Sequence, residues 1–230
     1  RPPRSTPKPS SAASDVYKRQ AKYLLEKDQS VKISFPMTKP KTPDSIRAFA
    51  ELNNEKVIDE NPTFGKIPIL KTWKGDAGKF ITFGLTATKH PETGVRNLGV
   101  YRIQIIDDTH ALMHWQKHKR GAQHEIISKK TNNRIETAII IGGVPATIFS
   151  AVAPVPEGLD KYLFAGITRK KGINTVRCKT IDIDVPANAE IVLEGYVDSS
   201  DIRDEGPFGD HTGYYTPKEP YPTFTLTGIM

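Results

Sequence analysis

Short β-like segments follow one another through most of the chain, and this pattern limits the possible folds more than any other feature. From Gly65 onward, alternating or β-branched runs are separated by Gly, Pro, Asn or Asp. The predicted strands are 67–73, 80–87, 99–106, 111–115, 136–141, 146–152, 174–184, 190–197 and 223–229. Strands of this length and spacing are typical of a barrel. We therefore predict a barrel or split barrel, with helical interruptions around 116–130 and 157–166.

The segments before the barrel differ in kind. Residues 1–20 are rich in Pro and Ser and hold five cations against one anion, which is +4 of the net charge of +7. They lack the apolar centre of a signal peptide, so we expect a non-native or disordered leader. Residues 21–64 mix a strand-like run with a short helix around 44–52 and are expected to be part of an N-terminal α/β region. We expect a fragment whose barrel domain, 65–230, is truncated at its C-terminus.

Composition argues against several classes of protein. No apolar run reaches the roughly 18 residues that a membrane-spanning helix needs. The single cysteine, Cys178, excludes an intramolecular disulfide framework and a thiolate-rich metal site, and favours a reducing, cytoplasmic compartment. Residues 21–230 carry only +3. The charge therefore gives little support to nucleic-acid binding.

The first candidate motif is Asn-Leu-Gly-Val-Tyr-Arg at 97–102. On a strand, Val100 and Arg102 face one side and Tyr101 the other. An arginine at a barrel mouth can bind a carboxylate or phosphate through two parallel hydrogen bonds. The alternative is an exposed arginine paired with a neighbouring acid.

The second motif, at 113–121, combines histidines, cations and a tryptophan. His114 and His118 would share a helix face, which suits a metal, but no carboxylate nearby completes a site. Anion binding is the better interpretation, with Trp115 offering a flat surface to an aromatic ring. The cations that could hold a phosphate are Lys117, Lys119 and Arg120. The alternative is a solvated basic turn.

The most specific motif is Glu-Gly-Pro-Phe-Gly-Asp-His-Thr-Gly-Tyr-Tyr at 205–215. Its glycines and Pro207 prevent a regular helix, so we predict a tight, defined loop. The loop presents Glu205 and Asp210, followed by His211. Carboxyl groups held close together raise the pKa of one of them, so one acid can stay protonated near neutral pH. A plain surface turn is the alternative, but the aromatic content favours burial.

Together with segments at 75–78, 81–85, 152–156, 164–166 and 185–196, these motifs resemble the UbiD family of carboxy-lyases. The resemblance implies an α+β, mainly β fold, in which a split-barrel flavin-binding domain follows part of an α/β region. It implies prenylated FMN, held through its phosphate and a divalent metal (Mn²⁺ or Mg²⁺). The implied reaction is non-oxidative decarboxylation of an aromatic acid, of the prenylated 4-hydroxybenzoate type used in ubiquinone biosynthesis.

The resemblance also implies a role for individual residues. Arg102 would hold the substrate carboxylate, Glu205 would support Arg102, and Asp210 would donate the proton that replaces CO₂, which requires a raised pKa. Asn97 would be a metal ligand. The implied cofactor contacts are Asn97, Val100, Tyr101, Arg102, His114, Trp115, Gln116, Lys119 and Arg120.

One position departs from the family pattern. Where the family has a metal-binding glutamate, this chain has Lys161. A protonated lysine cannot ligate a hard divalent ion. Three explanations are open: Asp160 substitutes through a local shift, the ammonium group neutralises the phosphate directly, or the metal site is impaired.

The implied partners are the aromatic acid, a flavin prenyltransferase that supplies the cofactor, and further copies of the full-length protein in a homo-oligomer. Peripheral association with a membrane stays open.

Two other functions remain as alternatives to decarboxylation. An FMN-dependent oxidoreductase on a similar barrel would use the basic and aromatic segment but would not need Glu205 and Asp210. The third hypothesis is a basic barrel that binds nucleic acid.

Overall fold

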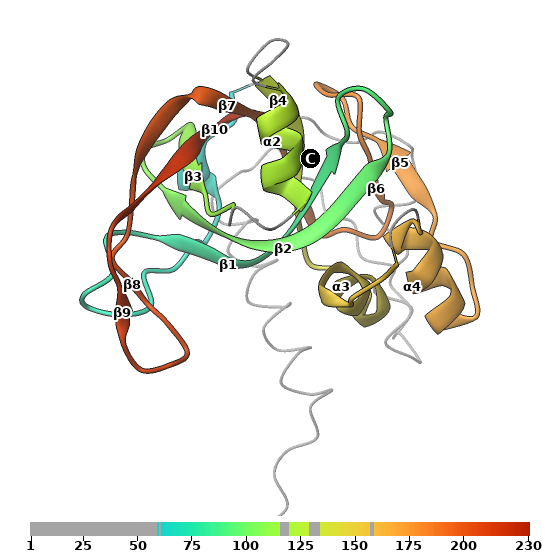
Figure 1. Cartoon of the computed structure of the whole chain (residues 1–230), viewed down its shortest axis with the longest axis horizontal. Helices are drawn as coiled ribbons and strands as arrows, with labels where there is room; N and C mark the ends of the chain where they lie inside the picture. The colour runs from blue at the N-terminus through green and yellow to red at the C-terminus, as the bar shows by residue number, and fades with distance from the viewer. Residues whose placement is uncertain (1–58, 60, 116–119, 129–133, 157–158) are drawn as a thin grey trace, which may run out of the picture. The chain divides into compact units, whose positions relative to one another are not determined.

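The structure is a computed structural model that describes residue 59 and residues 61–115, 120–128, 134–156 and 159–230 (Figure 1). All of these belong to one compact unit, Val57–Met230. The predictions for the leader, for residues 21–58 and for the helix around 44–52 lie outside the described residues.

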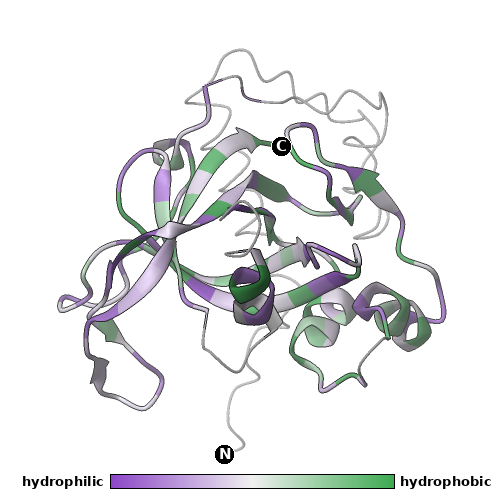
Figure 2. Cartoon of the chain, turned by 45° about the horizontal axis from the view of Figure 1, so that its top comes forward, coloured by the Kyte–Doolittle hydropathy of each residue, from purple (hydrophilic) through white to green (hydrophobic). Residues whose placement is uncertain are grey.

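Six strands form a closed antiparallel barrel in the order β1-β2-β3-β10-β7-β4. Their bounds are β1 Phe80–Lys89, β2 Arg96–Ile105, β3 His110–Met113, β4 Arg134–Ile141, β7 Ile191–Glu205 and β10 Glu219–Ile229. The predicted barrel is confirmed. Alternation along these strands sends every second side chain inward, and Figure 2 shows apolar and polar residues alternating along the strands.

The barrel interior is filled by one apolar cluster to which all six strands contribute. From β2 it receives Tyr101 and Ile103, and from β10 it receives the fully buried Phe224. Phe224 fits because Gly195 on β7 has no side chain: a methyl group there would lie 2.0 Å from the backbone oxygen of Thr225. Glycine at position 195 therefore allows β7 and β10 to approach closely while the Phe224 ring packs against the backbone of β7.

A second apolar layer covers the outside of the barrel wall. Leu98 of β2 and neighbouring residues of β1, β4 and β7 pack in one cluster with Tyr162 of α4 and Val185 of β6. This layer comprises α3 (Pro145–Val152), α4 (Lys161–Arg169) and the paired strands β5 (Thr175–Arg177) and β6 (Asp184–Pro186). Because β2 alternates, its even-numbered residues face this outer side and its odd-numbered residues face the barrel interior.

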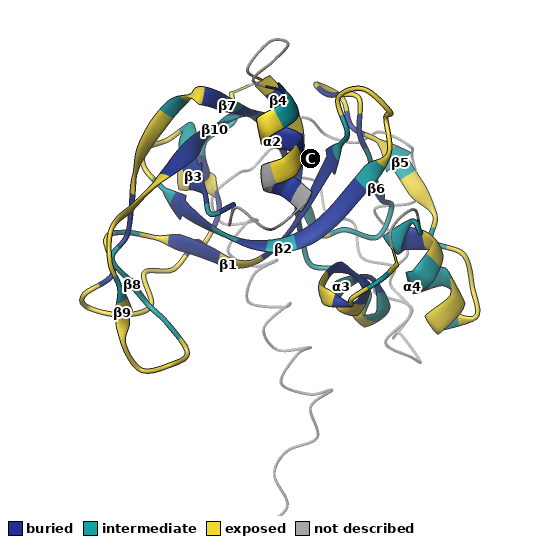
Figure 3. Ribbon diagram, in the orientation of Figure 1, coloured by how far each residue is buried: buried dark blue, intermediate teal, exposed yellow. Residues whose placement is uncertain are grey.

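Three smaller elements complete the described fold. Helix α2 (Arg120–Ser128) packs against β1, β2 and β4, and a short 3₁₀ turn, η2, spans Phe64–Lys66. Strands β8 (Phe208–Gly209) and β9 (Tyr215–Thr216) form a hairpin that extends the β7–β10 connection. Figure 3 shows buried residues concentrated on the barrel strands and exposed ones on this hairpin.

Three predicted strands differ in the structure. Residues 146–152 are helical, in α3, because Pro145 starts the helix and the buried residues Thr147, Ser150 and Ala151 follow a helical spacing. Residues 67–73 form no strand beyond an isolated bridge between Leu70 and Phe80. Residues 174–184 divide into β5 and the start of β6.

The helical interruptions are confirmed at α2 and α4. Within the described part of the chain, no helix has the length and apolar character to cross a membrane.

Candidate active site

A buried ion pair between β2 and β7 forms the centre of the site. Arg102 lies on the outer, even-numbered side of β2, and Glu205 is the last residue of β7. Arg102 Nε donates to Glu205 Oε1 at 2.6 Å and Nη2 donates to Oε2 at 2.7 Å, a two-pronged arrangement that fixes the guanidinium plane. The Glu205 side chain is 0% exposed. The structure thus brings together the first two predicted catalytic residues.

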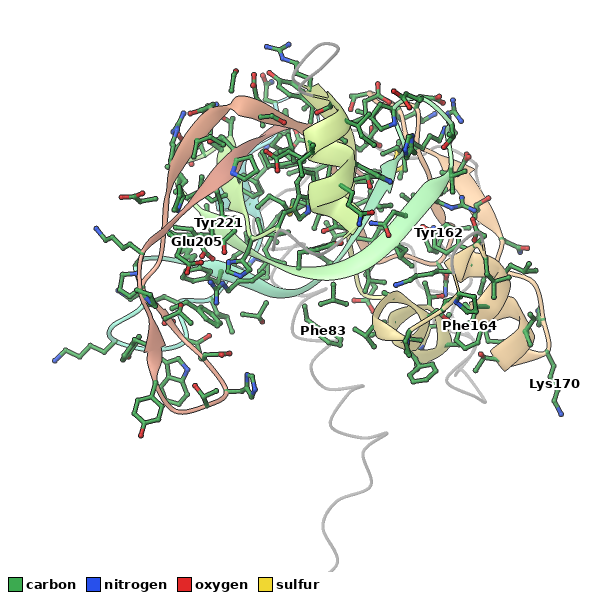
Figure 4. All side chains as sticks on the ribbon, viewed as in Figure 1. Phe83, Tyr162, Phe164, Lys170, Glu205 and Tyr221 are labelled. Atoms are coloured by element: carbon green, nitrogen blue, oxygen red, sulfur yellow. The ribbon has the colours of Figure 1, made fainter. Side chains whose placement is uncertain are left out.

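The ion pair is enclosed by rings. The guanidinium carbon of Arg102 lies 4.3 Å from the centre of the Phe208 ring. His114 follows β3, and its Nδ1 lies 2.9 Å from Arg102 Nη2 and 3.0 Å from Glu205 Oε2. The Tyr221 ring packs against His114 with centroids 4.3 Å apart. In Figure 4, Glu205 and Tyr221 lie together on one side of the barrel, away from Tyr162 on α4.

Two opposing effects set the protonation of Glu205. Burial favours the neutral acid and would raise its pKa, but the two hydrogen bonds from the Arg102 guanidinium outweigh burial, so the pKa of Glu205 lies below its usual value. Glu205 is therefore a carboxylate at neutral pH. It can hold Arg102 but has no proton to give.

Asp210 lies on the β8–β9 connection and lines the same cavity as Arg102. Its Oδ1 contacts His211 Nδ1 at 2.8 Å and accepts a hydrogen bond from the His211 backbone N–H. These bonds lower the pKa of Asp210. The prediction of a raised pKa is wrong for this structure, because the contact with His211 stabilises the carboxylate more than the slight burial of Asp210 destabilises it.

Backbone hydrogen bonds hold the loop that carries both carboxylates. Asp76 is buried, and its carboxylate accepts the backbone N–H groups of Trp73 and Gly209, each at 2.8 Å. Gln104 Oε1 accepts the N–H of Gly206 at 2.6 Å, next to Glu205. Gly206 has φ +97°, a conformation that suits glycine.

Sequence analysis did not predict Asp76 and Gln104 as site residues. For Asp76 a signal existed, since it lies in the segment 75–78 that contributes to the family resemblance.

The site opens into a cavity of about 1120 Å³, lined by aromatic and charged residues. Among those lining it are Arg102, His114, Trp115, Phe208, Asp210 and Tyr221. Aromatic side chains beside convergent charged groups are typical of a cofactor or substrate site, and the cavity is large enough for a flavin ring system. Glu219 and Tyr221 of β10, which sequence analysis did not single out, also line it.

The other predicted cofactor contacts divide into three groups. Tyr101 points into the barrel core, where its hydroxyl accepts the N–H of Gly121 at 3.3 Å, so it does not line the cavity. Val100 packs against the outer apolar layer. Gln116, Lys119 and the neighbouring Lys117 and His118 lie outside the described residues, and Arg120 is the first residue of α2.

The buried indole of Trp115, near the start of α2, offers a hydrogen-bond donor to a ligand. Its indole Nε1 is buried, has no hydrogen-bond partner among the described residues, and lies beside Gly121. A buried donor without a partner is costly. The cavity and this donor therefore fit the ring portion of a flavin, while the segment expected to bind the phosphate lies outside the described residues.

The described residues do not form a metal site. Asn97 is buried and its Nδ2 has no described partner, but no group of three or more metal-binding acids, histidines or cysteines occurs in the described ranges. Asp160 is otherwise engaged: Oδ1 caps α4 through the N–H groups of Tyr162 and Leu163, and Oδ2 pairs with Arg96 at 2.7 Å. Lys161 Nζ donates to the backbone oxygen of Ala151 at 2.6 Å. Substitution by Asp160 would cost α4 its cap.

Residues 46–230 match a family described as UbiD, the 3-octaprenyl-4-hydroxybenzoate carboxy-lyase Rift-related domain. An uncharacterized protein of Archaeoglobus fulgidus is 54% identical over 165 residues, which is 71% of this chain and 34% of that protein. The chain spans about a third of the length of the relatives it matches.

Two solved structures share the fold. An evolved dimeric form of the UbiD-class enzyme HmfF from Pelotomaculum thermopropionicum, in complex with prFMN, is 30% identical with a TM-score of 0.73, over 76% of this chain and 41% of that one. The closed form of vanillic acid decarboxylase from Sedimentibacter hydroxybenzoicus is 26% identical with a TM-score of 0.73, over 76% of this chain and 38% of that one.

Proposed function

This chain belongs to the UbiD family of carboxy-lyases, and from this membership we propose that it forms the cofactor-binding part of a non-oxidative decarboxylase. The proposed substrate is an aromatic acid of the prenylated 4-hydroxybenzoate type, as in ubiquinone biosynthesis, and the proposed cofactor is prenylated FMN. The observation that carries the proposal is the buried Arg102–Glu205 pair, which lies beside a cavity that Asp210 also lines. The structural likeness to an enzyme solved with prFMN supports it.

Loss of CO₂ leaves an electron pair on carbon, and a bound modified flavin supplies the electron sink that side chains lack. Arg102 is suited to hold the substrate carboxylate. Glu205 occupies Nε and one hydrogen of Nη2, and Nη1 makes no hydrogen bond to any described residue. Nη1 can therefore bind the substrate carboxylate while Glu205 keeps the guanidinium plane fixed.

Asp210 is the proposed proton donor. Its lowered pKa depends mainly on His211, whose side chain is 88% exposed and makes this contact at the surface. A substrate that separates the two residues and excludes water would raise the pKa of Asp210, because burial without a partner favours the neutral acid. Asp210 could then deliver a proton to the carbon that CO₂ leaves.

The cofactor proposal names residues for each part of the group. Trp115 and Arg102 would lie beside the flavin ring, with Lys119 and Arg120 on the phosphate. Asn97 remains the proposed metal ligand, and Lys161 is the residue proposed to weaken metal-dependent cofactor binding.

If Lys161 has this effect, Lys161→Glu should raise metal and flavin occupancy, measured by elemental analysis and absorbance after purification. Equal occupancy in both forms would count against this role for Lys161.

The decisive experiment is co-expression of the full-length protein with a flavin prenyltransferase, followed by measurement of bound flavin and of CO₂ released from 4-hydroxybenzoate derivatives. Glu205→Gln and Asp210→Asn should retain flavin and lose CO₂ release. Asp201→Asn, which removes a surface partner of Arg203, is the matched control and should keep activity. Redox turnover that survives in both site variants would indicate a flavin oxidoreductase instead, and absence of flavin and of CO₂ release would defeat the proposal.

A further inference from the structure

We propose that His114 is a positioning residue for Arg102, and that Tyr221 and Glu219 select the histidine tautomer that does this. The inference rests on the proposed function, because its consequence concerns how Arg102 meets a carboxylate. The four side chains form one hydrogen-bonded line from β2, across the residue that follows β3, to β10.

The line starts at Arg102 Nη2, which has two hydrogens. One goes to Glu205 Oε2 at 2.7 Å. The other lies toward His114 Nδ1 at 2.9 Å. Arginine can only donate, so this second bond requires a lone pair on His114 Nδ1. In the neutral ring, the proton is then on Nε2.

Tyr221 and Glu219 fit this tautomer from the opposite side of the ring. The Tyr221 hydroxyl has a single hydrogen and donates it to Glu219 Oε2 at 2.7 Å. Its oxygen therefore presents lone pairs to His114 Nε2, 3.4 Å away. An Nε2–H donor matches these lone pairs, whereas an unprotonated Nε2 would face another acceptor. The bond at one ring nitrogen thus fixes the proton content of the other.

The opposite tautomer satisfies fewer groups. A hydrogen on Nδ1 could donate to Glu205 Oε2 at 3.0 Å, but it would then face the Arg102 N–H at 2.9 Å. In the Nε2–H form, Arg102 Nη2 donates toward two acceptors, Glu205 Oε2 and His114 Nδ1, which lie 3.0 Å apart.

The consequence is control over the free end of the guanidinium. Glu205 and His114 both lie within hydrogen-bond distance of Nη2, so two partners on different elements hold the guanidinium group and with it the direction of Nη1. A carboxylate arriving in the cavity then meets a donor with a defined direction. Small errors in the placement of such groups cost large factors in rate.

The tautomer can be measured without turnover. In the full-length protein labelled with ¹⁵N-histidine, this chain contributes six histidines, and loss of one pair of ring signals in His114→Asn assigns His114. At about pH 8, where free imidazole is neutral, we expect the Nε2–H tautomer in the wild type and a shift toward the other tautomer in Tyr221→Phe. The Nδ1–H tautomer in the wild type would overturn the proposal whether or not the protein releases CO₂.

Kinetics test the positioning role. His114→Leu should raise the KM for the acid about tenfold, and Tyr221→Phe about fivefold, as expected for the loss of single hydrogen bonds. His114→Asn keeps an acceptor near the Nδ1 position and should recover most of the loss. Tyr196→Phe, in a tyrosine on β7 whose ring packs on Arg134, is the matched control and should change nothing.

A merely structural His114 would show no recovery in the asparagine variant. That result, or an unchanged KM in both His114→Leu and Tyr221→Phe, would contradict the positioning role. A wild type without activity that still shows the Nε2–H tautomer would refute the proposed function and leave the hydrogen-bonded line intact.

Discussion

Glu205 keeps its negative charge although its side chain has no contact with solvent, because the Arg102 guanidinium donates a hydrogen bond to each of its two oxygens. A buried carboxylate of this kind depends strongly on its partners, since loss of one partner leaves the other charge buried alone. The ion pair that orients the proposed substrate therefore also links β2 to the end of β7, two strands that are not hydrogen-bonded neighbours in the barrel.

The first prediction concerns Glu205 and pH. Glu205→Gln should lower the free energy of unfolding by about 3 kcal/mol at pH 7. Because the folded-state pKa of Glu205 lies below its ordinary value of 4.5, the stabilisation is present above about pH 4.5 and is lost as the pH falls further. Urea unfolding at several pH values should show the two proteins converging in acid. A gap that stays constant down to pH 3 would contradict this account.

The second prediction concerns Asp210. His211→Ala removes the ring contact that lowers the pKa of Asp210, so this pKa should rise toward its ordinary value. Carboxyl ¹³C chemical shifts followed through an acid titration measure the change. His110→Ala, which removes a similar contact from Asp107, should leave Asp210 unchanged and serves as the control. A pKa of Asp210 that does not move would show that His211 is not its main partner.

At this scale the sequence pointed to Arg102, Glu205 and Asp210 through the motifs that carry the family resemblance. The structure pairs Arg102 with Glu205 and lines one cavity with Arg102 and Asp210, and their catalytic roles stay predictions. It missed Glu219 and Tyr221, whose pattern is that of an ordinary strand. Only the pairing of β10 with β3 and β7 brings them to His114, and pairing across long sequence separations is not visible in a local pattern. The direction of the Asp210 pKa shift was also missed, because it depends on a side-chain geometry that spacing does not fix.

At the scale of elements, the β8–β9 hairpin carries Asp210 and is attached both by hydrogen bonds and by the Phe208 ring, which packs edge-on against Phe80 with centroids 4.8 Å apart. The hydrogen bonds come from the segment around Asp76. The Asp76 carboxylate accepts the backbone N–H of Gly209, and the backbone N–H of Ala77 donates to the backbone oxygen of Pro207. The hairpin is thus placed by hydrogen bonds to a segment far away in the sequence.

The third prediction tests this attachment. Asp76→Ala leaves two partly buried N–H groups without their acceptor and should cost about 1–2 kcal/mol of stability. It should also raise hydrogen exchange in residues 206–216 more than in the barrel strands. Asp198→Ala, which removes a half-buried carboxylate on β7 that pairs with Arg134, is the control and should leave exchange in the hairpin unchanged. Uniform exchange across the hairpin and the barrel would argue against a local clamp.

Helix α3 shows why sequence reasoning was incomplete for elements. Residues 146–152 contain β-branched and aromatic residues that favour a strand, yet only Thr147, Ser150 and Ala151 are buried, at a helical spacing. A short apolar run fits both periods, and here packing of α3 against α4 decides between them. The longer alternating runs of β1, β2, β4 and β7 left no such ambiguity.

At the scale of the whole molecule, closure of the barrel depends on a close approach of β7 and β10. The fourth prediction is that Gly195→Ala destabilises the fold by about 2 kcal/mol or more, because the added methyl group would meet the Thr225 oxygen and the Phe224 ring. Gly172→Ala, which meets nothing within 4 Å, should be nearly neutral. Thermal unfolding of both variants tests the difference, and equal melting temperatures would contradict it.

The alternation of β2 has a consequence for engineering and for sequence divergence. Tyr101 fills the barrel and Arg102 faces the cavity, so a single inserted or deleted residue in β2 would turn the arginine into the apolar core and the phenol out. The packing of the core and the placement of Arg102 thus depend on the same alternation of side chains along β2, so a one-residue shift of this strand would disrupt both. The exposed residues 91–95 between β1 and β2 lie outside that constraint, which makes them the place for a fluorescent label or an affinity tag.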